Sequence, residues 1–377
     1  MKPKYEVADI FRQYGDEYKE THAMSKEQRK AMAAITVCRT AQLGGHQEVC
    51  NNCGGIRNSY NSCRNRHCPK CQTLTKEEWL DKRREELLPC GYFHFVLTVP
   101  HVLNPLILAN RKELLSTLFQ AVKETIFSFA ADPQWKLEGR PGILAILHTW
   151  SQVLIDHFHI HCLIPAGVLS FDGRKWIKGK ENYLFRAESV ALEFKKQYLQ
   201  KIEKQLEGLT VPANVDNLLK QAWGKTWIVY AKKPFSGPEQ VLEYLGRYTH
   251  RIAISNHRIK AIDNGKITFT YKDRSNNNQT KTMTLDAMEF IRRFLLHVLP
   301  SRFMKIRYYG FLANICKKKN VLLIRRLIGV AMEVREFVKE TIEEKILRLT
   351  GHDILLCPFC RQGRMLPLDI LPALDST

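Results

Sequence analysis

Three groups of residues in this chain could do chemistry. Cysteines stand as Cys50-x2-Cys53 and, after 14 further residues, as Cys68-x2-Cys71. Three histidines alternate with apolar residues over 157–161, and two tyrosines stand four apart at positions 244 and 248. Thiolates bind zinc, imidazoles hold catalytic cations, and phenols can act as covalent nucleophiles. No group is decisive alone, but together they indicate metal-dependent nucleophilic chemistry.

The cysteine block is expected to bind zinc. Each Cys-x2-Cys turn delivers two thiolates to an ion, and the distance between the two turns is close to that of zinc ribbons. We therefore predict that one structural zinc is bound by Cys50, Cys53, Cys68 and Cys71. Spare ligands nearby allow a possible second zinc; they are Cys38, His46, Cys63 and His67. Alternatively, Cys63 and His67 simply pack or contact phosphate.

Two further features accompany this block. Basic residues among the cysteines suit phosphate contact; they are Arg57, Arg64, Arg66 and Lys70. Far along the chain, Cys357-x2-Cys360 offers half a metal site, to which His352 could add a third ligand. The alternative is that these two cysteines are ordinary thiols.

The histidines are predicted to lie on a strand. Side chains alternate between the faces of a strand, so His157, His159 and His161 share one face, with neighbours about 6.6–6.8 Å apart. We expect His159 and His161 to hold a cation, with His157 as an additional candidate, because the apolar run 162–165 buries that end of the strand. The third ligand stays open; the candidates are Gln152, Asp156, His157 and Gln240. Ordinary core or surface histidines are the alternative.

The tyrosines are predicted to lie on a helix. Tyr244 and Tyr248 are neighbours on one face, with Gln240 before them on the same face. A phenol whose pKa is near 10 is a poor nucleophile at neutral pH, so its attack on phosphorus needs a cation nearby. Taken alone, the two rings would more often pack on a core.

The elements that position these residues follow from the pattern of the sequence. Runs of β type cover 93–100, 142–148 and 158–164, and a helical pattern covers about 104–131. This order predicts an α+β fold with a ferredoxin-like sheet, in which the second and third strands are adjacent and antiparallel. A charged, mostly helical insertion follows over about 171–226, then a strand over 227–230 and a helix over 237–249.

The rest of the chain surrounds this sheet. Helices are expected over 5–36, with a turn near Gly15 and a capping box at Ser25. A helix over about 76–88 and a hairpin at Asn264-Gly265 are also expected, with a basic, helical tail from about residue 286. The predicted domains are a helical arm (1–37), a zinc-ribbon-like domain with its linker helix (38–88), a catalytic domain (89–314) and the tail (315–377).

Charge and cysteine usage limit the class of protein. With 58 basic and 38 acidic residues the net charge is +20, which favours binding to nucleic acid, although a membrane surface also attracts cations. No run approaches the roughly 18 apolar residues that cross a bilayer, so we expect a cytoplasmic, nucleoid-associated protein without a membrane partner. In such a long chain without a leader, paired cysteines indicate metal and free thiols rather than disulfides.

The motif order resembles that of the HUH endonucleases, in which U is a hydrophobic residue. The segments on which this resemblance rests are Phe95 to Pro100, His159-Ile160-His161 and Tyr244 to Arg251. With Cys-Arg-Asn-Arg-His-Cys-Pro-Lys-Cys at 63–71, the chain resembles the two-tyrosine rolling-circle transposases of the insertion-sequence ninety-one family, over about residues 38–314.

The resemblance implies a mechanism and its cofactors. His159 and His161 would bind Mg²⁺ or Mn²⁺, and Tyr244 and Tyr248 would attack single-stranded DNA at the element ends and hold a 5′-phosphate. DNA contacts are expected from Arg64, Arg66, Arg247, Arg251 and Arg307, with further cations and rings over 292–326. Alternatives are a plasmid or phage replication initiator or relaxase, and a non-catalytic zinc-dependent DNA-binding protein.

Overall fold

The structure is a computed structural model that divides the chain into two units. It describes residues 3–180, 182, 184–235, 238–249, 252–273, 276–330 and 340–374, without the side chains of Thr73, Lys233, Pro238, Glu239, Arg247 and Tyr248. The first unit comprises 1–75, 252–298 and 333–377, and the second comprises 76–251 and 299–332. Each unit is described by itself below.

The second unit is built on a five-stranded antiparallel sheet. Its strands are β3 (Tyr92–Thr98), β5 (Gly142–Trp150), β6 (Asp156–Pro165), β9 (Val229–Phe235) and β13 (Ile306–Gly310). Their order across the sheet is β13-β5-β6-β3-β9, and every neighbouring pair is antiparallel.

The expected α+β topology is confirmed. Between β3 and β5 the chain forms α4 (Asn104–Ala109) and α5 (Arg111–Ala131), and β6 then lies between these two strands. This is the split strand-helix-strand arrangement of ferredoxin-like sheets, and the second and third strands pair as predicted. The single helix expected over 104–131 is interrupted at Asn110.

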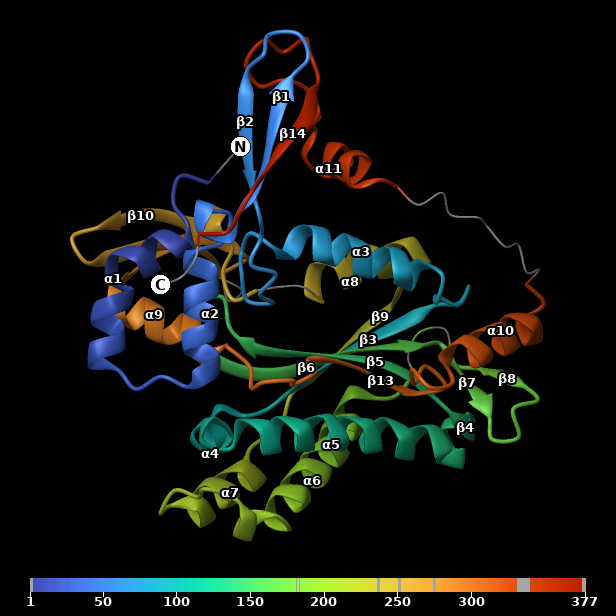
Figure 1. Ribbon diagram of the computed structural model, residues 1–377. Helices are drawn as coiled ribbons and strands as arrows, with labels where there is room; N and C mark the ends of the chain where they lie inside the picture. The colour runs from blue at the N-terminus through green and yellow to red at the C-terminus, as the bar shows by residue number, and fades with distance from the viewer. Residues whose placement is uncertain are drawn as a thin grey trace. The chain divides into compact units, whose positions relative to one another are not determined.

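The two faces of this sheet bury different residues. Phe158, Ile160 and Cys162 of β6 belong to a large core shared with α4, α5, α6 (Ala187–Glu203) and α7 (Val215–Gly224). Leu163 belongs to a second core with α3 (Gln72–Arg84), α8 (Pro238–Tyr248) and α10 (Lys317–Ile328). Figure 1 shows α4 to α7 on one side of the sheet and α3 and α8 on the other. The alternation therefore directs the even-numbered residues of β6 to one core and the histidines to the face under α8.

The insertion is mostly helical, as expected, through α6 and α7. It also includes β8 (Trp176–Lys178), which pairs with β7 (Gly167–Ser170), and β7 pairs with β4 (Gly139–Arg140). The three short strands form a separate sheet at the start of the insertion.

Two small sheets belong to the first unit. One has the order β10 (Ile259–Asp263), β11 (Lys266–Asp273) and β12 (Gln279–Asp286), and the predicted Asn264-Gly265 turn joins its first two strands at φ of 46° and 72°. The other has the order β14 (Met365–Leu371), β1 (Gly45–Cys50) and β2 (Ile56–Tyr60), which lie side by side in Figure 1.

Helices complete the first unit. They are α1 (Val7–Thr21), α2 (Lys26–Thr36), α9 (Ala287–Leu296) and α11 (Ile342–Thr350). The rings of Phe11 on α1 and Phe294 on α9 meet edge to face, with centroids 5.5 Å apart. The capping box of Ser25 with Gln28 forms as predicted.

Several local expectations were wrong. The helix α1 runs through Gly15 without a turn, and Gly15 lies on its buried face next to Met32 of α2. The tail expected to be helical contains β13 and β14 as well as helices, and β12 was not expected. Strands β13 and β14 pair with segments far away in the sequence, and β12 extends the hairpin of β10 and β11. Local sequence pattern does not reveal such pairing.

The units divide the chain differently from the expected domains. Residues 252–298, expected within the catalytic domain, fall in the first unit together with the cysteine block. The four expected domains remain a prediction. No helix in the described part of the chain has the length and apolar character needed to span a bilayer.

Candidate active site and metal centres

Three buried histidines form a group on the face of the sheet under α8. The ligand atoms of His148, His159 and His161 all lie within 4.8 Å of one another. His148 on β5 is directly opposite His159 on β6, and His161 follows two residues along the same face. All three are less than 9% exposed. The group includes the predicted pair and supplies a third imidazole.

His148 was missed by sequence reasoning. Among the candidate third ligands, Asp156 and His157 are not in the group, and Gln152 and Gln240 stay predictions. His157 instead lies toward His101, with Nδ1 and Nε2 of the two rings 3.0 Å apart. His148 ends the β-type run 142–148, so its position opposite His159 could have been found only by assuming the register of the two strands.

Tyr244 places its hydroxyl at this group. Its Oη lies 2.9 Å from Nδ1 of His161 and also contacts Nε2 of His94 on β3. The two imidazoles are themselves 3.0 Å apart through Nε2 of His94 and Nδ1 of His161. The ring of Tyr244 packs on Phe235, with centroids 5.0 Å apart. One aromatic side chain thus has both a packing role and a polar contact with the histidines.

His94 is kept neutral by its surroundings. Burial, assisted by the positive charge of Lys232, lowers the pKa of His94 to about 4. At neutral pH His94 is therefore uncharged, and a neutral imidazole can take part in hydrogen bonds with the Tyr244 hydroxyl without adding a positive charge. In the sequence, His94 is marked only by its place in a β-type run.

The donor set of the three histidines fits a divalent transition-metal ion. Imidazole nitrogens bind such ions, whereas Mg²⁺ prefers oxygen ligands and would take most of them from water and phosphate. Nδ1 of His161 lies 2.9 Å from the Tyr244 hydroxyl, so an ion held by this imidazole would lie close to that hydroxyl. Of the expected ions, Mn²⁺ suits these nitrogen donors better than Mg²⁺.

The remaining predicted residues of this helix are only partly visible. Tyr248 is the last residue of α8, one turn beyond Tyr244, but its side chain and that of Arg247 lie outside the described part. Arg251 lies wholly outside the described residues. Their expected roles stay predictions.

The cysteines form two clusters where one was expected. Cys38, Cys63, Cys68 and Cys71 make up the first, and Cys50, Cys53, Cys357 and Cys360 make up the second. The predicted ligand set of Cys50, Cys53, Cys68 and Cys71 is therefore wrong. The cause is the pairing of β1 with β14, which brings residues 357–360 to the turn that carries Cys50 and Cys53.

The first cluster has the dimensions of a zinc site. Sulfur atoms lie 3.5 Å apart between Cys38 and Cys71 and 3.7 Å apart between Cys63 and Cys71. Four thiolates at about 2.3 Å from zinc in a tetrahedron are about 3.8 Å apart. Of the possible second-site ligands, Cys38 and Cys63 thus complete this cluster, while His46 and His67 are not in it.

Several basic residues near the cysteines are engaged within the protein. Arg57 pairs with Glu48 at 2.7 Å, and Lys70 pairs with Glu6 at 2.5 Å. Arg66 is half-buried and donates to His67, whereas Arg64 is exposed and has a positive φ of 51°. Arg64 is the best placed of these four for phosphate contact.

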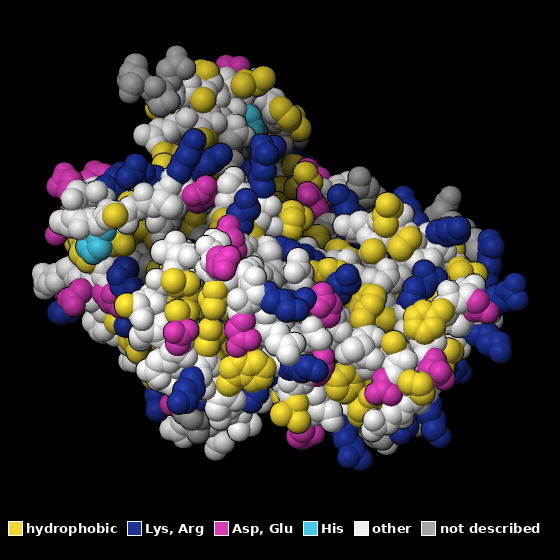
Figure 2. Space-filling model, turned by 90° about the horizontal axis from the view of Figure 1, so that it is seen from below, with side chains coloured by type: hydrophobic (Ala, Val, Ile, Leu, Met, Phe, Trp, Pro, Cys, Tyr) yellow, Lys and Arg dark blue, Asp and Glu magenta, His cyan; other side chains and the backbone are white. Residues whose placement is uncertain are grey.

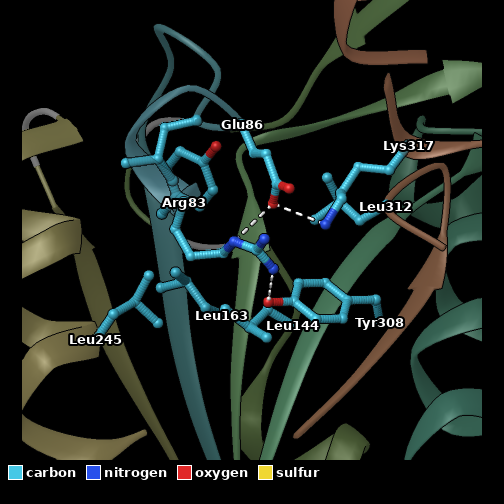
Figure 3. Close-up of a pocket in the computed structure, with 10 residues that line it drawn as sticks. Arg83, Glu86, Leu144, Leu163, Leu245, Tyr308, Leu312 and Lys317 are labelled. Atoms are coloured by element: carbon cyan, nitrogen blue, oxygen red, sulfur yellow. Dashed lines mark hydrogen bonds and ion pairs between the residues drawn. The ribbon is translucent and has the colours of Figure 1, made fainter. Parts of the chain in front are cut away.

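The stretch over 292–326 is largely a packed part of the second unit rather than a DNA track. Phe311 is 1% exposed, and Arg307 lies over the ring of Phe119 at 4.3 Å. Figure 3 shows a hollow lined by Arg83, Glu86, Tyr308 and Lys317, in which Glu86 pairs with Arg83 at 3.0 Å and with Lys317 at 2.7 Å. These contacts engage Arg83, Lys317 and Arg307 within the unit. Of the rings expected over 292–326, Phe311 is buried and cannot stack on a base, and phosphate contact by Arg307 stays a prediction.

The surface of the second unit on the side of α4 to α7 shows no single basic patch. In Figure 2, Lys and Arg side chains are interspersed there with acidic and apolar ones. The positive charge of the chain is therefore spread over that face.

Comparisons with known proteins agree with this arrangement. The family model described as "Putative transposase" matches residues 142–319, and the one described as "Transposase zinc-binding domain" matches residues 10–99. A "Putative transposase y4qJ" of Sinorhizobium fredii is 42% identical over 97% of this chain and 95% of its own length. The "Transposase for insertion sequence element IS801" of Pseudomonas savastanoi pv. phaseolicola is 30% identical, over 76% of this chain and 70% of its own. No solved structure matches significantly.

The matches define a transposase, an enzyme that acts on DNA, and in this chain it is built from an α+β sheet with buried histidines and two cysteine clusters. With these matches, the chain belongs to the insertion-sequence ninety-one family of transposases. Its cysteine-rich part is a zinc-binding domain of that family.

Proposed function

We propose that this transposase nicks and rejoins single-stranded DNA at the ends of its element through 5′-phosphotyrosine intermediates. The observation that carries the proposal is the hydroxyl of Tyr244, 2.9 Å from His161, a member of the buried three-histidine group. This contact places a nucleophilic oxygen next to imidazoles that could hold a cation, as the chemistry requires. The single-stranded substrate and the rolling-circle course of transposition follow from the family resemblance.

In the cleavage step, Oη of Tyr244 attacks the phosphorus of a phosphodiester. A bond forms between Oη and phosphorus, and the bond between phosphorus and the 3′ oxygen breaks. Nε2 of His94 contacts this hydroxyl, the phenolic proton is released to water as the new bond forms, and the 3′ oxygen leaves with a proton from water. The products are a free 3′-OH and a 5′-phosphate esterified to the tyrosine.

His148, His159 and His161 would hold the catalytic cation. When bound, the ion polarises the phosphate and stabilises the negative charge that develops in the transition state. The histidines are fixed on paired strands, so their imidazoles need little rearrangement. Burial of the site strengthens electrostatic interactions with the phosphate.

The tyrosine ester conserves the energy of the broken bond. A free 3′-OH can attack it, which reforms a phosphodiester and releases the tyrosine, so no ATP is required. Tyr248, one helical turn further, would serve as the second nucleophile and would allow one strand end to be held while another is cut. This chemistry on chromosomal DNA would take place in the cytoplasm, at the nucleoid.

The test is incubation of the full-length protein with labelled single-stranded element ends and Mn²⁺ or Mg²⁺. We expect a covalent protein–DNA adduct and a product with a free 3′-OH. The variant His159→Ala/His161→Ala should bind DNA but give no adduct, because binding rests on many phosphate contacts and chemistry on one cation. Cleavage of the DNA without any covalent protein–DNA adduct at any time point would refute the proposal.

A further inference from the structure

The second cysteine cluster is formed by two segments that are far apart in the sequence. Cys50 and Cys53 follow β1, whereas Cys357 and Cys360 precede β14, more than 300 residues later. The matched zinc-binding domain ends at residue 99, so it does not include the second pair. The four ligand atoms nevertheless lie within 4.8 Å of one another.

The sulfur positions fit a tetrahedral ion. The sulfur atoms of Cys50 and Cys360 are 3.7 Å apart, and those of Cys53 and Cys357 are also 3.7 Å apart. Thiolates bound to one zinc are about 3.8 Å apart, whereas a disulfide bond is about 2.05 Å long. The spacing is that of a metal site and not that of two disulfides.

The two Cys-x2-Cys turns have the same internal hydrogen bonds. In the first turn, the backbone N–H groups of Asn52 and Cys53 donate to Sγ of Cys50 at 3.3 and 3.4 Å. In the second turn, those of Phe359 and Cys360 donate to Sγ of Cys357 at 3.4 and 3.5 Å. Amide donors stabilise a thiolate and orient it toward a metal. Each turn is therefore organised as one half of a site.

The surrounding chain leaves no room for other packing. A Cβ at Gly363 would lie 2.5 Å from Sγ of Cys50, and one at Gly55 would lie 3.3 Å from Sγ of Cys53. The local core consists of Cys50, Cys357 and Met365, with Cys360 packed against it. So few apolar atoms cannot hold two distant segments together, and a bound metal would supply the missing stability.

We propose that Cys50, Cys53, Cys357 and Cys360 bind a second structural zinc ion, separate from the ion of Cys38, Cys63, Cys68 and Cys71. Four thiolates in a closed tetrahedral set select zinc and supply no open position for catalysis. In this arrangement β14 is an integral part of the zinc-binding domain, because it pairs with β1 and its preceding turn supplies half of the ligands. The proposal does not depend on the nicking mechanism.

The test compares double variants of the full-length protein loaded with Co²⁺. Absorption by sulfur-to-cobalt charge transfer counts thiolate ligands and does not respond to an ion on the histidines. We expect Cys357→Ser/Cys360→Ser and Cys50→Ser/Cys53→Ser each to halve this absorption, and the quadruple variant to lose no more than either. Cys68→Ser/Cys71→Ser should remove the other half. Cys316→Ser, outside both clusters, is the matched control and should change nothing.

A second measurement uses the wild-type protein and so does not depend on the folding of variants. The zinc-loaded protein is treated with N-ethylmaleimide, and each cysteine peptide is quantified by mass spectrometry before and after addition of a chelator. Cys357 and Cys360 should be protected and should become reactive together with Cys50 and Cys53. Full reactivity of Cys357 and Cys360 in zinc-loaded protein would overturn the proposal. A second outcome would also overturn it. The Cys50/Cys53 and Cys68/Cys71 variants would each lose the same single ion, and the Cys357/Cys360 variant would lose none.

Discussion

At the scale of single residues, the candidate site depends on imidazoles that three different strands bring together. His148 lies on β5, His94 on β3, and His159 and His161 on β6 between them. Tyr244 reaches this set from α8 with its hydroxyl. Which of these residues meet therefore depends on how the strands pair and in which register, and cannot be read from any one segment of the sequence.

Replacement of His148 tests the third ligand. We expect His148→Ala to lower the single-turnover nicking rate by at least about 100-fold at limiting Mn²⁺, because one of three imidazoles is lost. DNA affinity should change little, since phosphate contacts lie elsewhere. His157→Ala is the control, because His157 is outside the group, and its effect should be much smaller. An unchanged rate for His148→Ala would remove it from the metal site.

The sequence allowed part of this site to be predicted. Alternation along one strand, together with the apolar run 162–165 that follows it, sufficed to select His159 and His161, because both arguments need only local sequence. His148 and His94 could not be selected, because their roles depend on which strands pair and in which register. The zinc ligands were misassigned for the same reason: any two Cys-x2-Cys turns look alike until long-range pairing decides which of them meet.

At the scale of elements, α8 sets the position of Tyr244 through its packing. Val241, Leu242 and Leu245 of this helix lie in the core under α3. A Cβ at Gly246 would lie 3.1 Å from Cδ1 of Leu80 on α3, so the two helices approach closely at this glycine. A larger side chain there must push aside the Leu80 side chain or move α8 away from α3.

Gly246→Leu should therefore impair the chemistry without touching the reacting groups. A displacement of Tyr244 by about 1 Å is expected to slow adduct formation on the order of 100-fold. The rate of adduct formation in a single turnover is the measurement. Gly224→Leu on α7 is the control, because nothing lies within 4 Å of a Cβ at that glycine. Equal rates for the two variants would show that α8 is not positioned by this contact.

The zinc-binding elements lack a core of their own, and removal of zinc should reveal this. The cluster of buried residues around Cys50, Cys357 and Met365 is small, whereas the sheet of the second unit has a large apolar core. After treatment with a strong chelator, limited proteolysis should cut first within residues 38–75 and 351–371. The sheet core should stay resistant. If the sheet core were cut as early as residues 38–75 and 351–371, the metal would stabilise the whole chain.

At the scale of the whole molecule, the net charge of +20 governs encounter with DNA. A protein that neutralises phosphates releases counterions, so its affinity falls as salt rises. On the face shown in Figure 2, basic side chains are mixed with acidic and apolar ones. Arg64 in the cysteine block is an exposed basic residue.

Arg64→Ala should reduce the salt dependence of binding to single-stranded DNA. One lost phosphate contact lowers the slope of log affinity against log salt by about 0.7. Arg12→Ala is the matched control, because it removes the same charge from an arginine that already pairs with Asp9 at 2.7 Å. Titrations at several salt concentrations give both slopes. Identical slopes for the two variants would exclude Arg64 from phosphate contact.

The parts of the fold that depend on segments close together in the sequence were predictable. The order strand, helix, strand, strand gave the split arrangement of β3, β5 and β6, and Asn264-Gly265 gave its hairpin. Strands β13 and β14 were not predicted, because each is short and pairs with a segment far away in the sequence. The same long-range pairing explains why residues 351–371 join the cysteine block.

The covalent adduct provides the most direct test of the account as a whole. The full-length protein is incubated with labelled single-stranded element ends and Mn²⁺, digested, and the DNA-linked peptide is sequenced by mass spectrometry. The phosphodiester should be on Tyr244 or Tyr248, and Tyr244→Phe/Tyr248→Phe should keep DNA binding, because only hydroxyls are lost, yet form no adduct. An adduct on any other residue, or an adduct formed by the double variant, would contradict the mechanism.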